Sequence, residues 1–166
     1  MNIVIVDYGI GNVKSIMNAF ENQGEKTVLS RDRDVVLKAD GLILPGVGAF
    51  SHGMNNLNKY GLVNIIKDYV KTGKPLLGIC LGMQLLLEES QEFGVTKGIG
   101  LIKGKVIKLP VEKSNKIKLP HISWNAIQTK NIEWENTILN GINTNSNMYF
   151  VHTFVAKPEN EDEILS

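Results

Sequence analysis

The sequence Leu76-Leu77-Gly78-Ile79-Cys80-Leu81-Gly82 joins a short apolar run to a nucleophilic side chain that lies between two glycines. This pattern is typical of a nucleophile elbow, a sharp turn between a strand and a helix that exposes the reactive residue. We expect glycine on both sides because larger side chains would collide with the neighbouring strand and helix. A structural cysteine is the other interpretation, since a lone Cys is often a small buried hydrophobic residue.

An elbow also positions groups that assist the nucleophile. The backbone N–H after the nucleophile, here that of Leu81, points at the reacting carbonyl. A helix that begins beneath the sulfur favours the thiolate, which is the nucleophilic form. Gln84 follows Cys80 by about one helical turn, so we expect its amide on the same side as the sulfur. That amide could bind a polar substrate group, although a solvent-exposed glutamine would show the same spacing.

Apolar runs and amphipathic stripes alternate along the first half of the chain. The runs predict strands at residues 3–6, 27–29, 42–44 and 76–79. The stripes predict helices at residues 13–23, 62–70 and 83–89. This alternation predicts an α/β fold with an open, mostly parallel sheet flanked by helices.

The second half of the chain has a different texture. Beyond about Phe93, glycines separate short β-rich runs at residues 105–109, 116–119 and 148–154. These runs predict a β-hairpin-rich C-terminal part at the edge of the α/β core. Residues 132–141 predict a short helix or turn. No repeat or linker interrupts the sequence, so we interpret residues 1–166 as a single domain.

The composition excludes several classes of protein. The formal net charge of 166 residues is +1, which gives no electrostatic reason to expect nucleic acid or a membrane as partner. The single cysteine cannot form an internal disulfide, which fits a cytoplasmic location. The first seven residues lack the basic segment and the apolar length of a signal peptide. No motif indicates a cofactor or a metal site.

Three loops are expected to lie beyond the carboxyl ends of the strands, where open parallel sheets bind ligands. They are the elbow and residues 7–12 and 45–50. The loop 7–12 has Lys14 where a dinucleotide fingerprint needs its third glycine, so a tight turn is the simpler interpretation.

The loop 45–50 has the sequence Pro-Gly-Val-Gly-Ala-Phe. Gly46 and Gly48 leave the backbone N–H groups between them unshielded and able to approach an oxyanion. An elbow needs a second oxyanion donor from a neighbouring loop, and this loop is placed to supply it. Taken alone, the same residues would fit an ordinary turn.

Taken together, these motifs resemble a known family. Pro45-Gly46-Val47-Gly48 and the elbow through Gln84 resemble the class I, triad-type glutamine amidotransferases. The segments 7–12, 44–50, 119–125 (Leu-Pro-His-Ile-Ser-Trp-Asn) and 149–154 (Tyr-Phe-Val-His-Thr-Phe) more specifically resemble the glutaminase subunits that serve imidazole glycerol phosphate synthesis. The resemblance runs in order along the whole chain and implies an open α/β sheet of the flavodoxin-like kind.

The resemblance implies a chemistry for the elbow. Cys80 would attack the side-chain amide of glutamine, release ammonia and form a glutamyl thioester that water hydrolyses. The backbone N–H groups of Val47 and Leu81 would form the oxyanion hole. The residues implied in glutamine binding are Gly46, Gly48, Gln84, Glu92, His152, Thr153 and Phe154.

The resemblance also implies a protein partner. A (β/α)₈-barrel cyclase subunit would receive the ammonia in a heterodimer and make imidazole glycerol phosphate and AICAR in histidine biosynthesis. The residues implied at the interface are Asn12, Lys14, His121, Trp124, Asn125 and Tyr149. Ser123 stands where the family usually has glycine, and related amidotransferases that feed surface-sugar synthesis share most of these motifs. The acceptor of the ammonia therefore stays open.

One family feature is absent from the sequence. A late His-Pro-Glu segment normally supplies the general base and the carboxylate that orients it. None of the three histidines, His52, His121 and His152, precedes Pro-Glu, and His152 is the least unsuitable substitute. We expect that the chain lacks its C-terminal portion, since residues 163–166 look like the opening of another strand. The alternative is a pseudo-glutaminase subunit that binds but does not hydrolyse glutamine.

Overall fold

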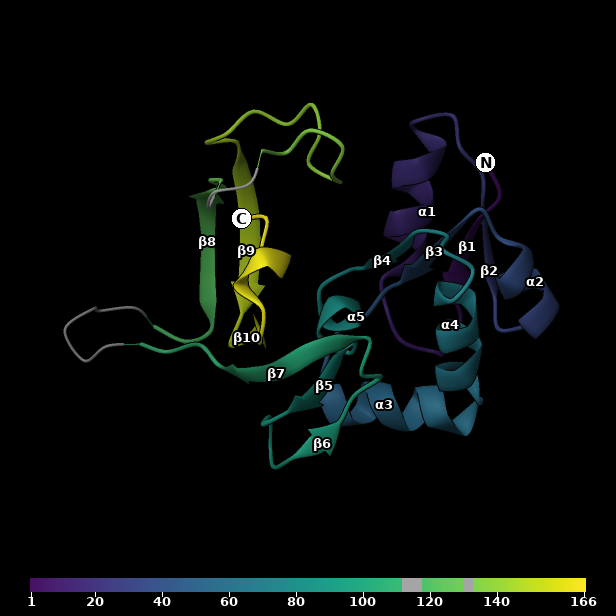
Figure 1. The fold of residues 1–166 in the computed structure, drawn as a ribbon, viewed down its shortest axis with the longest axis horizontal. Coiled ribbons are helices and arrows are strands. Elements are labelled where there is room, and N and C mark those ends of the chain that lie inside the picture. The colour runs from purple at the N-terminus through teal and green to yellow at the C-terminus, as the bar shows by residue number, and fades with distance from the viewer. Residues whose placement is uncertain (112–117, 130–132) are drawn as a thin grey trace.

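A computed structural model describes residues 1–111, 118–129 and 133–166 of the chain. Its N-terminal half is a four-stranded parallel sheet with the strand order β2-β1-β3-β4 (Figure 1). The strands are β1 (Ile3–Val6), β2 (Thr27–Ser30), β3 (Gly41–Leu44) and β4 (Leu76–Gly78). The central strand β1 is buried along its whole length, as expected for a parallel strand covered on both faces.

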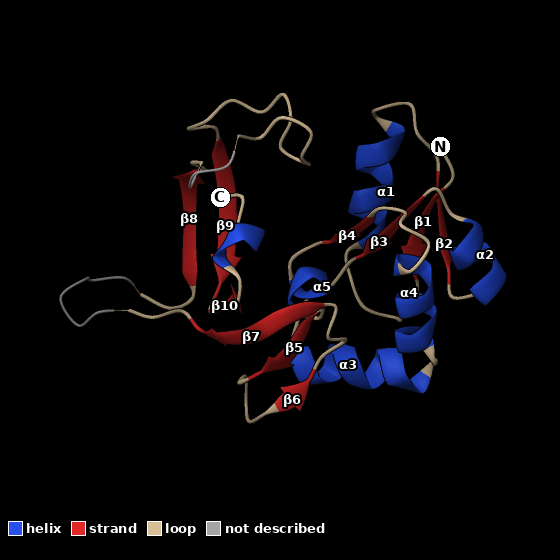
Figure 2. Ribbon diagram, viewed as in Figure 1, coloured by secondary structure: helices blue, strands red, loops and turns tan. Residues whose placement is uncertain are grey.

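Helices cover both faces of this sheet (Figure 2). They are α1 (Val13–Glu21), α2 (Arg33–Lys38), α3 (Phe50–Lys59) and α4 (Leu62–Val70). The apolar stripe of α1, which includes Ile16 and Phe20, packs on Ile5 and Ile43 of the sheet. The other face of the sheet packs against buried residues from α2, α3 and α4 in one larger core. The expected fold class, an open and mostly parallel sheet flanked by helices, is confirmed.

A second sheet follows, with the strand order β10-β7-β5-β6. Its strands are β5 (Leu87–Ser90), β6 (Thr96–Lys97), β7 (Ile102–Lys108) and β10 (Phe154–Pro158). β5 and β7 run parallel, whereas β6 and β10 are antiparallel to their neighbours. A separate hairpin of β8 (His121–Ala126) and β9 (Asn147–His152) stands beside this sheet (Figure 1). The expected β-hairpins are therefore present.

The expected helix at residues 83–89 is wrong. The helix α5 (Leu81–Gln84) has four residues, and the chain then continues as strand β5. The three consecutive leucines 85–87 are all buried, which a helix with one apolar face cannot achieve. The backbone of Leu86 instead accepts hydrogen bonds from Leu101 and Ile102, which join the elbow helix to the second sheet.

Other differences lie near the C-terminus. The run 148–154 is not one strand, because the chain leaves β9 after His152 to pair β10 with β7 instead of β8. The expected strand opening at residues 163–166 is also wrong. A short 3₁₀ turn, η1 (Glu161–Glu163), occupies that region, and residues 164–166 belong to no strand.

Two expected elements fall partly outside the described residues, namely the run 116–119 at positions 116 and 117 and the segment 132–141 at position 132. The described part of the latter, residues 133–141, consists of loop and turns. Helices α2 and α3 were not expected from the sequence. No helix in the three described ranges has the length and apolarity needed to cross a membrane.

Candidate active site around Cys80

Cys80 lies in the turn that joins β4 to α5. Its backbone has φ 54° and ψ −115°, and its side chain is exposed. A residue other than glycine rarely adopts a positive φ, and such strain persists only where the surrounding structure enforces it. This is the conformation of a nucleophile elbow. The helix that follows has only four residues, so few peptide dipoles are aligned beneath the sulfur.

The two flanking glycines hold the elbow in place by close backbone approach. A Cβ added at Gly82 would lie 1.8 Å from the carbonyl oxygen of Leu44 on β3. A Cβ added at Gly78 would lie 2.5 Å from the Cα of Met83 on α5. Any side chain at either position would push the elbow away from the sheet, so both glycines are required as the sequence predicts.

The loop after β3 packs directly on the elbow. A Cβ added at Gly46 would lie 2.7 Å from the backbone nitrogen of Gly82 and 2.8 Å from the Cβ of Leu81. Within the described ranges, neither Val47 nor Leu81 has a hydrogen-bond acceptor for its backbone N–H. Both N–H groups therefore remain available to an external oxygen, as an oxyanion hole requires.

Gln84 and the strand β10 meet beside the elbow. The Nε2 amide of Gln84 donates to the carbonyl oxygen of Phe154 at 3.2 Å. The preceding residue, Thr153, accepts a hydrogen bond from the backbone N–H of Leu109 on the loop after β7. The structure thus brings together the residues from the helix and from the late strand that the resemblance places in the glutamine pocket.

Glu92 lies at the other end of the loop 45–50. Its carboxylate accepts a hydrogen bond of 2.7 Å from the backbone N–H of Phe50, the first residue of α3. A carboxylate at a helix N-terminus satisfies an otherwise unpaired donor and interacts favourably with the helix dipole. Glu92 therefore fixes the point where the loop enters α3, and Gly48 lies between this anchor and Val47.

The histidines do not complete a triad with Cys80. His152 Nδ1 donates to the carbonyl oxygen of Phe154 at 3.1 Å, which leaves Nε2 to accept from His121 Nδ1 at 3.2 Å. Both ring nitrogens of His152 are thus already occupied. His52 is exposed on α3. Within the described ranges, no histidine forms a hydrogen bond to Cys80.

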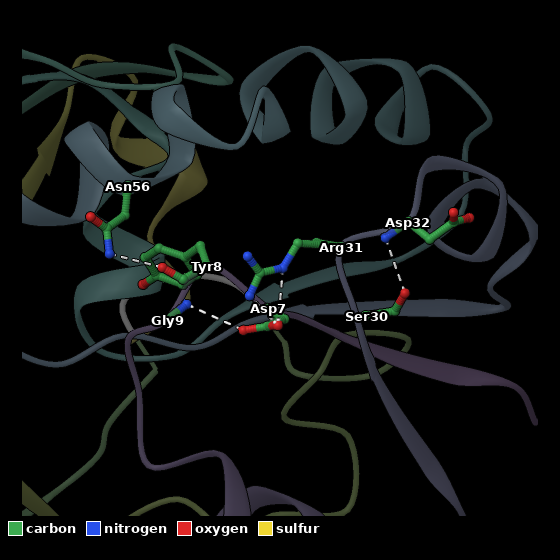
Figure 3. A network of polar contacts seen from close by, with 7 residues as sticks. All are labelled: Asp7, Tyr8, Gly9, Ser30, Arg31, Asp32 and Asn56. Atoms are coloured by element: carbon green, nitrogen blue, oxygen red, sulfur yellow. Dashed lines mark hydrogen bonds and ion pairs between the residues drawn. The ribbon is translucent and has the colours of Figure 1, made fainter.

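Tyr8 is a residue of this site that the sequence reasoning missed. It lies two residues after the end of β1, is fully buried, and donates its phenol hydroxyl to the carbonyl oxygen of Pro45. Burial raises the pKa of Tyr8, and the nearby Cys80 raises it further. Figure 3 shows Tyr8 beside Asn56 and Gly9. The signal in the sequence was a tyrosine in the loop after the first strand, a place where buried hydroxyls need partners.

The β8–β9 hairpin exposes apolar side chains on one of its faces. Ile122 pairs with Val151 and Trp124 pairs with Tyr149, so these four side chains share one face. All four are more than half exposed, and the rings of Trp124 and Tyr149 lie 5.5 Å apart. We call these four residues the hairpin ridge. Exposed apolar groups of this kind mark interaction surfaces.

The other expected interface residues are divided between two places. His121 and Asn125 lie on the hairpin itself, where with Phe150 they line a hollow of about 380 Å³. Asn12 and Lys14 are exposed at the start of α1. In Figure 1 this helix stands apart from the hairpin, so the structure does not bring the two sets into contact.

Another open cavity lies away from the elbow's candidate residues. About 690 Å³ of space lies between β5, β7 and β10, and its lining includes Glu88, Lys105 and Lys157. None of the candidate site residues lines it, and its mixed charges select for neither anions nor cations. Among the described residues, no cluster of His, Cys, Asp and Glu could hold a metal ion.

Comparisons with known proteins found similar sequences and folds. The family model described as "Glutamine amidotransferase class-I" matches residues 4–166. The chain is 44% identical over 167 residues to "Imidazole glycerol phosphate synthase subunit HisH" of Aquifex aeolicus (strain VF5), covering 100% of this chain and 77% of that protein. The protein of the same name from Geobacillus kaustophilus (strain HTA426) is 45% identical, with 99% and 77% covered.

Solved structures share the fold at lower sequence identity. "Crystal structure of glutamine amidotransferase" aligns with a TM-score of 0.68 at 16% identity, covering 95% of this chain and 75% of that chain. "Structure of PurLQS from Thermotoga maritima" aligns with a TM-score of 0.61 at 20% identity, covering 96% and 70%.

Proposed function

The chain belongs to the class I glutamine amidotransferases, and from that premise we propose that Cys80 hydrolyses glutamine to supply ammonia to a synthase partner. The observation that carries the proposal is the elbow. A cysteine at φ 54° lies exposed between two glycines that cannot be replaced, and the backbone N–H groups of Val47 and Leu81 have no hydrogen-bond acceptor within the described ranges. That combination serves acyl transfer to a thiolate.

The proposed reaction has two steps. The sulfur of Cys80 attacks the side-chain amide carbon of glutamine, and the tetrahedral oxyanion is stabilised by the N–H groups of Val47 and Leu81. The carbon–nitrogen bond then breaks, the nitrogen takes up a proton, and ammonia leaves a glutamyl thioester. Water hydrolyses the thioester, which releases glutamate and restores the thiol.

The proposed glutamine pocket lies between β10 and residues 45–50, which we call the oxyanion loop. Gly46, Gly48 and the segment His152-Thr153-Phe154, which links β9 to β10, form its backbone walls, with Gln84 held against Phe154. Glu92 is an anionic group at the edge of this pocket, suited to the α-amino group of glutamine.

A general base must still be supplied. No described histidine forms a hydrogen bond to Cys80, and this chain spans 77% of the Aquifex protein. We place the base and its carboxylate outside these 166 residues, in the same domain. The mass of the native polypeptide tests this placement, because a mass equal to that of the 166 residues would contradict it.

The proposed recipient of the ammonia is a (β/α)₈-barrel cyclase subunit that makes imidazole glycerol phosphate and AICAR. The support is the name shared by the curated relatives, each 44–45% identical to this chain. The hairpin ridge is the apolar surface suited to a protein partner. A heterodimer in the cytoplasm fits these features, and the single exposed thiol fits a reducing compartment.

The second candidate function is a subunit that docks on its synthase without hydrolysing glutamine. It is favoured by one observation, namely that both ring nitrogens of His152 are already hydrogen-bonded. A paralogous subunit that feeds ammonia to surface-sugar synthesis is the alternative for the acceptor, since Ser123 replaces the usual glycine.

The test measures glutamate release from glutamine by the native protein, alone and with the cyclase subunit and its nucleotide substrate. We expect weak hydrolysis alone, stimulation by the partner, and loss of activity in Cys80→Ala with complex formation retained. Hydrolysis that persists in Cys80→Ala would overturn the assignment of the nucleophile. Complex formation without any glutamate release by the wild type would support the docking subunit. Ammonia transfer without imidazole glycerol phosphate would point to another acceptor.

A further inference from the structure

The hydroxyl of Tyr8 contacts the oxyanion loop at its first residue, Pro45. Tyr8 has no exposed surface, and its hydroxyl donates to the carbonyl oxygen of Pro45. A Cβ added at Gly46 would lie 2.7 Å from the same hydroxyl oxygen, so the backbone of Gly46 lies directly over it. The phenol thus binds the peptide that joins Pro45 to Gly46, immediately before the peptide that carries the N–H of Val47.

The two glycines on either side of Val47 differ in how closely they are packed. Gly46, before Val47, packs closely between the hydroxyl of Tyr8 and the elbow, so it cannot shift without moving one of them. On the downstream side, Gly48 has φ 96°, and a Cβ built there would meet nothing within 4 Å. Rotation of the loop is therefore confined to the peptides on either side of Val47, whose side chain is 53% exposed.

Tyr8 is itself held in place by neighbouring side chains (Figure 3). Its backbone carbonyl accepts a hydrogen bond of 2.9 Å from Asn56 Nδ2 on α3. The preceding residue, Asp7, binds Arg31, and its other carboxylate oxygen accepts from the backbone N–H of Gly9. A side chain fixed at both its backbone and its hydroxyl can act as a rigid support for the loop above it.

From this geometry we infer that Tyr8 is a positioning residue for the oxyanion hole, which fixes the Pro45 carbonyl so that the N–H of Val47 can reach the oxyanion. The inference rests on the proposed glutaminase function of the same site. Tyr8 does not touch the reacting atoms in this role. It acts through the Pro45–Gly46 peptide, which it holds in place. The flexible part of the loop is then the segment around Val47, whose N–H is the oxyanion donor.

The structure provides a matched control for this inference. Tyr69 is also fully buried, and its hydroxyl also donates to the carbonyl oxygen of a proline, Pro75, at 3.2 Å. Tyr69 lies on α4, outside the oxyanion loop and the elbow. Removing either hydroxyl therefore deletes the same chemical contact, and only the Tyr8 contact adjoins the proposed oxyanion donor.

The experiment compares Tyr8→Phe with Tyr69→Phe in the native protein bound to the cyclase subunit, with glutamine as substrate. Loss of one neutral hydrogen bond predicts a fall in kcat of about tenfold for Tyr8→Phe. We expect a change in KM below about twofold, because the oxyanion exists only in the transition state. Tyr69→Phe should leave both constants within about twofold of the wild type.

A second measurement distinguishes an effect on the oxyanion loop from an effect on the reactivity of the Cys80 thiol. Alkylation of Cys80 by iodoacetamide needs the thiolate but no oxyanion hole, so its rate should be unchanged in Tyr8→Phe. Equal kcat in wild type and Tyr8→Phe would overturn the inference. The inference would also be overturned if alkylation of Tyr8→Phe were slowed by the same factor as its kcat. The substitution would then act on the reactivity of the Cys80 thiol and not on the oxyanion hole.

Two further outcomes remain informative. Wild-type protein that is alkylated at Cys80 yet releases no glutamate would contradict the proposed function and not the placement of Tyr8. Should Tyr8→Phe fail to fold, Asn56→Ala releases the backbone of Tyr8 without changing its ring. A folded Asn56→Ala protein with unchanged kcat would then overturn the inference, whereas a lower kcat at constant KM would support it.

Discussion

The elbow and the β8–β9 hairpin show two opposite ways of using surface residues. At the elbow, backbone meets backbone so closely that Gly78 and Gly82 tolerate no Cβ, and a strained cysteine is exposed. On the hairpin, large apolar side chains lie exposed on an isolated two-stranded sheet. Substitutions at the elbow should therefore affect both function and the stability of the fold, whereas those on the hairpin ridge should leave stability almost unchanged.

The largest expected effect lies at the elbow. Gly82→Ala places a methyl group 1.8 Å from the carbonyl oxygen of Leu44 and should lower the free energy of unfolding by about 4 kcal/mol or more. The matched control is Gly24→Ala, where φ is 79° and no atom lies within 4 Å. It should cost only ~1 kcal/mol of backbone strain. Urea denaturation measures both, and equal losses would show that close packing does not govern the elbow.

The hairpin should respond in the opposite way. Trp124→Ala is expected to change the free energy of unfolding by no more than about 0.5 kcal/mol, because the side chain is 68% exposed. It should weaken binding of the cyclase subunit by ~2 kcal/mol, about 30-fold in Kd. Ile138, equally exposed but outside the hairpin, is the control residue for titration calorimetry. Similar losses for Trp124→Ala and Ile138→Ala would argue against the hairpin ridge as the docking surface.

A smaller effect concerns the strain at Cys80. Glycine adopts positive φ without steric cost, so Cys80→Gly should raise the free energy of unfolding by ~1 kcal/mol over Cys80→Ala, while both lose glutaminase activity. Denaturant titration of the two variants makes the comparison. If Cys80→Gly is no more stable than Cys80→Ala, the strained conformation carries no stored energy. A higher free energy of unfolding for Cys80→Gly than for Cys80→Ala would show that the strained backbone at residue 80 lowers stability in order to expose the nucleophile.

Local patterns predicted the parallel sheet well. The β-branched run at residues 3–6 and the apolar stripe from Val13 to Phe20 each have the period of the element that they form. The glycine-bracketed cysteine predicted the elbow because that turn leaves no room for larger side chains on either side of the nucleophile. Helix α3 escaped notice because its buried residues, Phe50, Gly53, Met54 and Leu57, include a glycine and are interspersed with polar asparagines.

The errors have a common physical cause. The leucines at 85–87 favour a helix by propensity, yet all three are buried and the chain extends to pair β5 with β7. The run 148–154 has the composition of one strand, yet β9 and β10 pair with different partners on either side of Thr153. Strand pairing joins segments that lie far apart in the sequence, so a pattern within one short segment cannot predict it.

The nucleophile and the glycines beside it follow from the sequence, because each depends on the local chemistry of a few neighbouring residues. The order of the strands and the surroundings of the nucleophile follow from the fold. A tyrosine in the loop after β1 indicates that its hydroxyl needs a partner, but the fold is needed to show that this partner is the carbonyl of Pro45, in the loop after β3. The sequence also left open that His152 would use both ring nitrogens on Phe154 and His121. Such contacts arise where parallel strands end together, and that meeting is a property of the folded sheet.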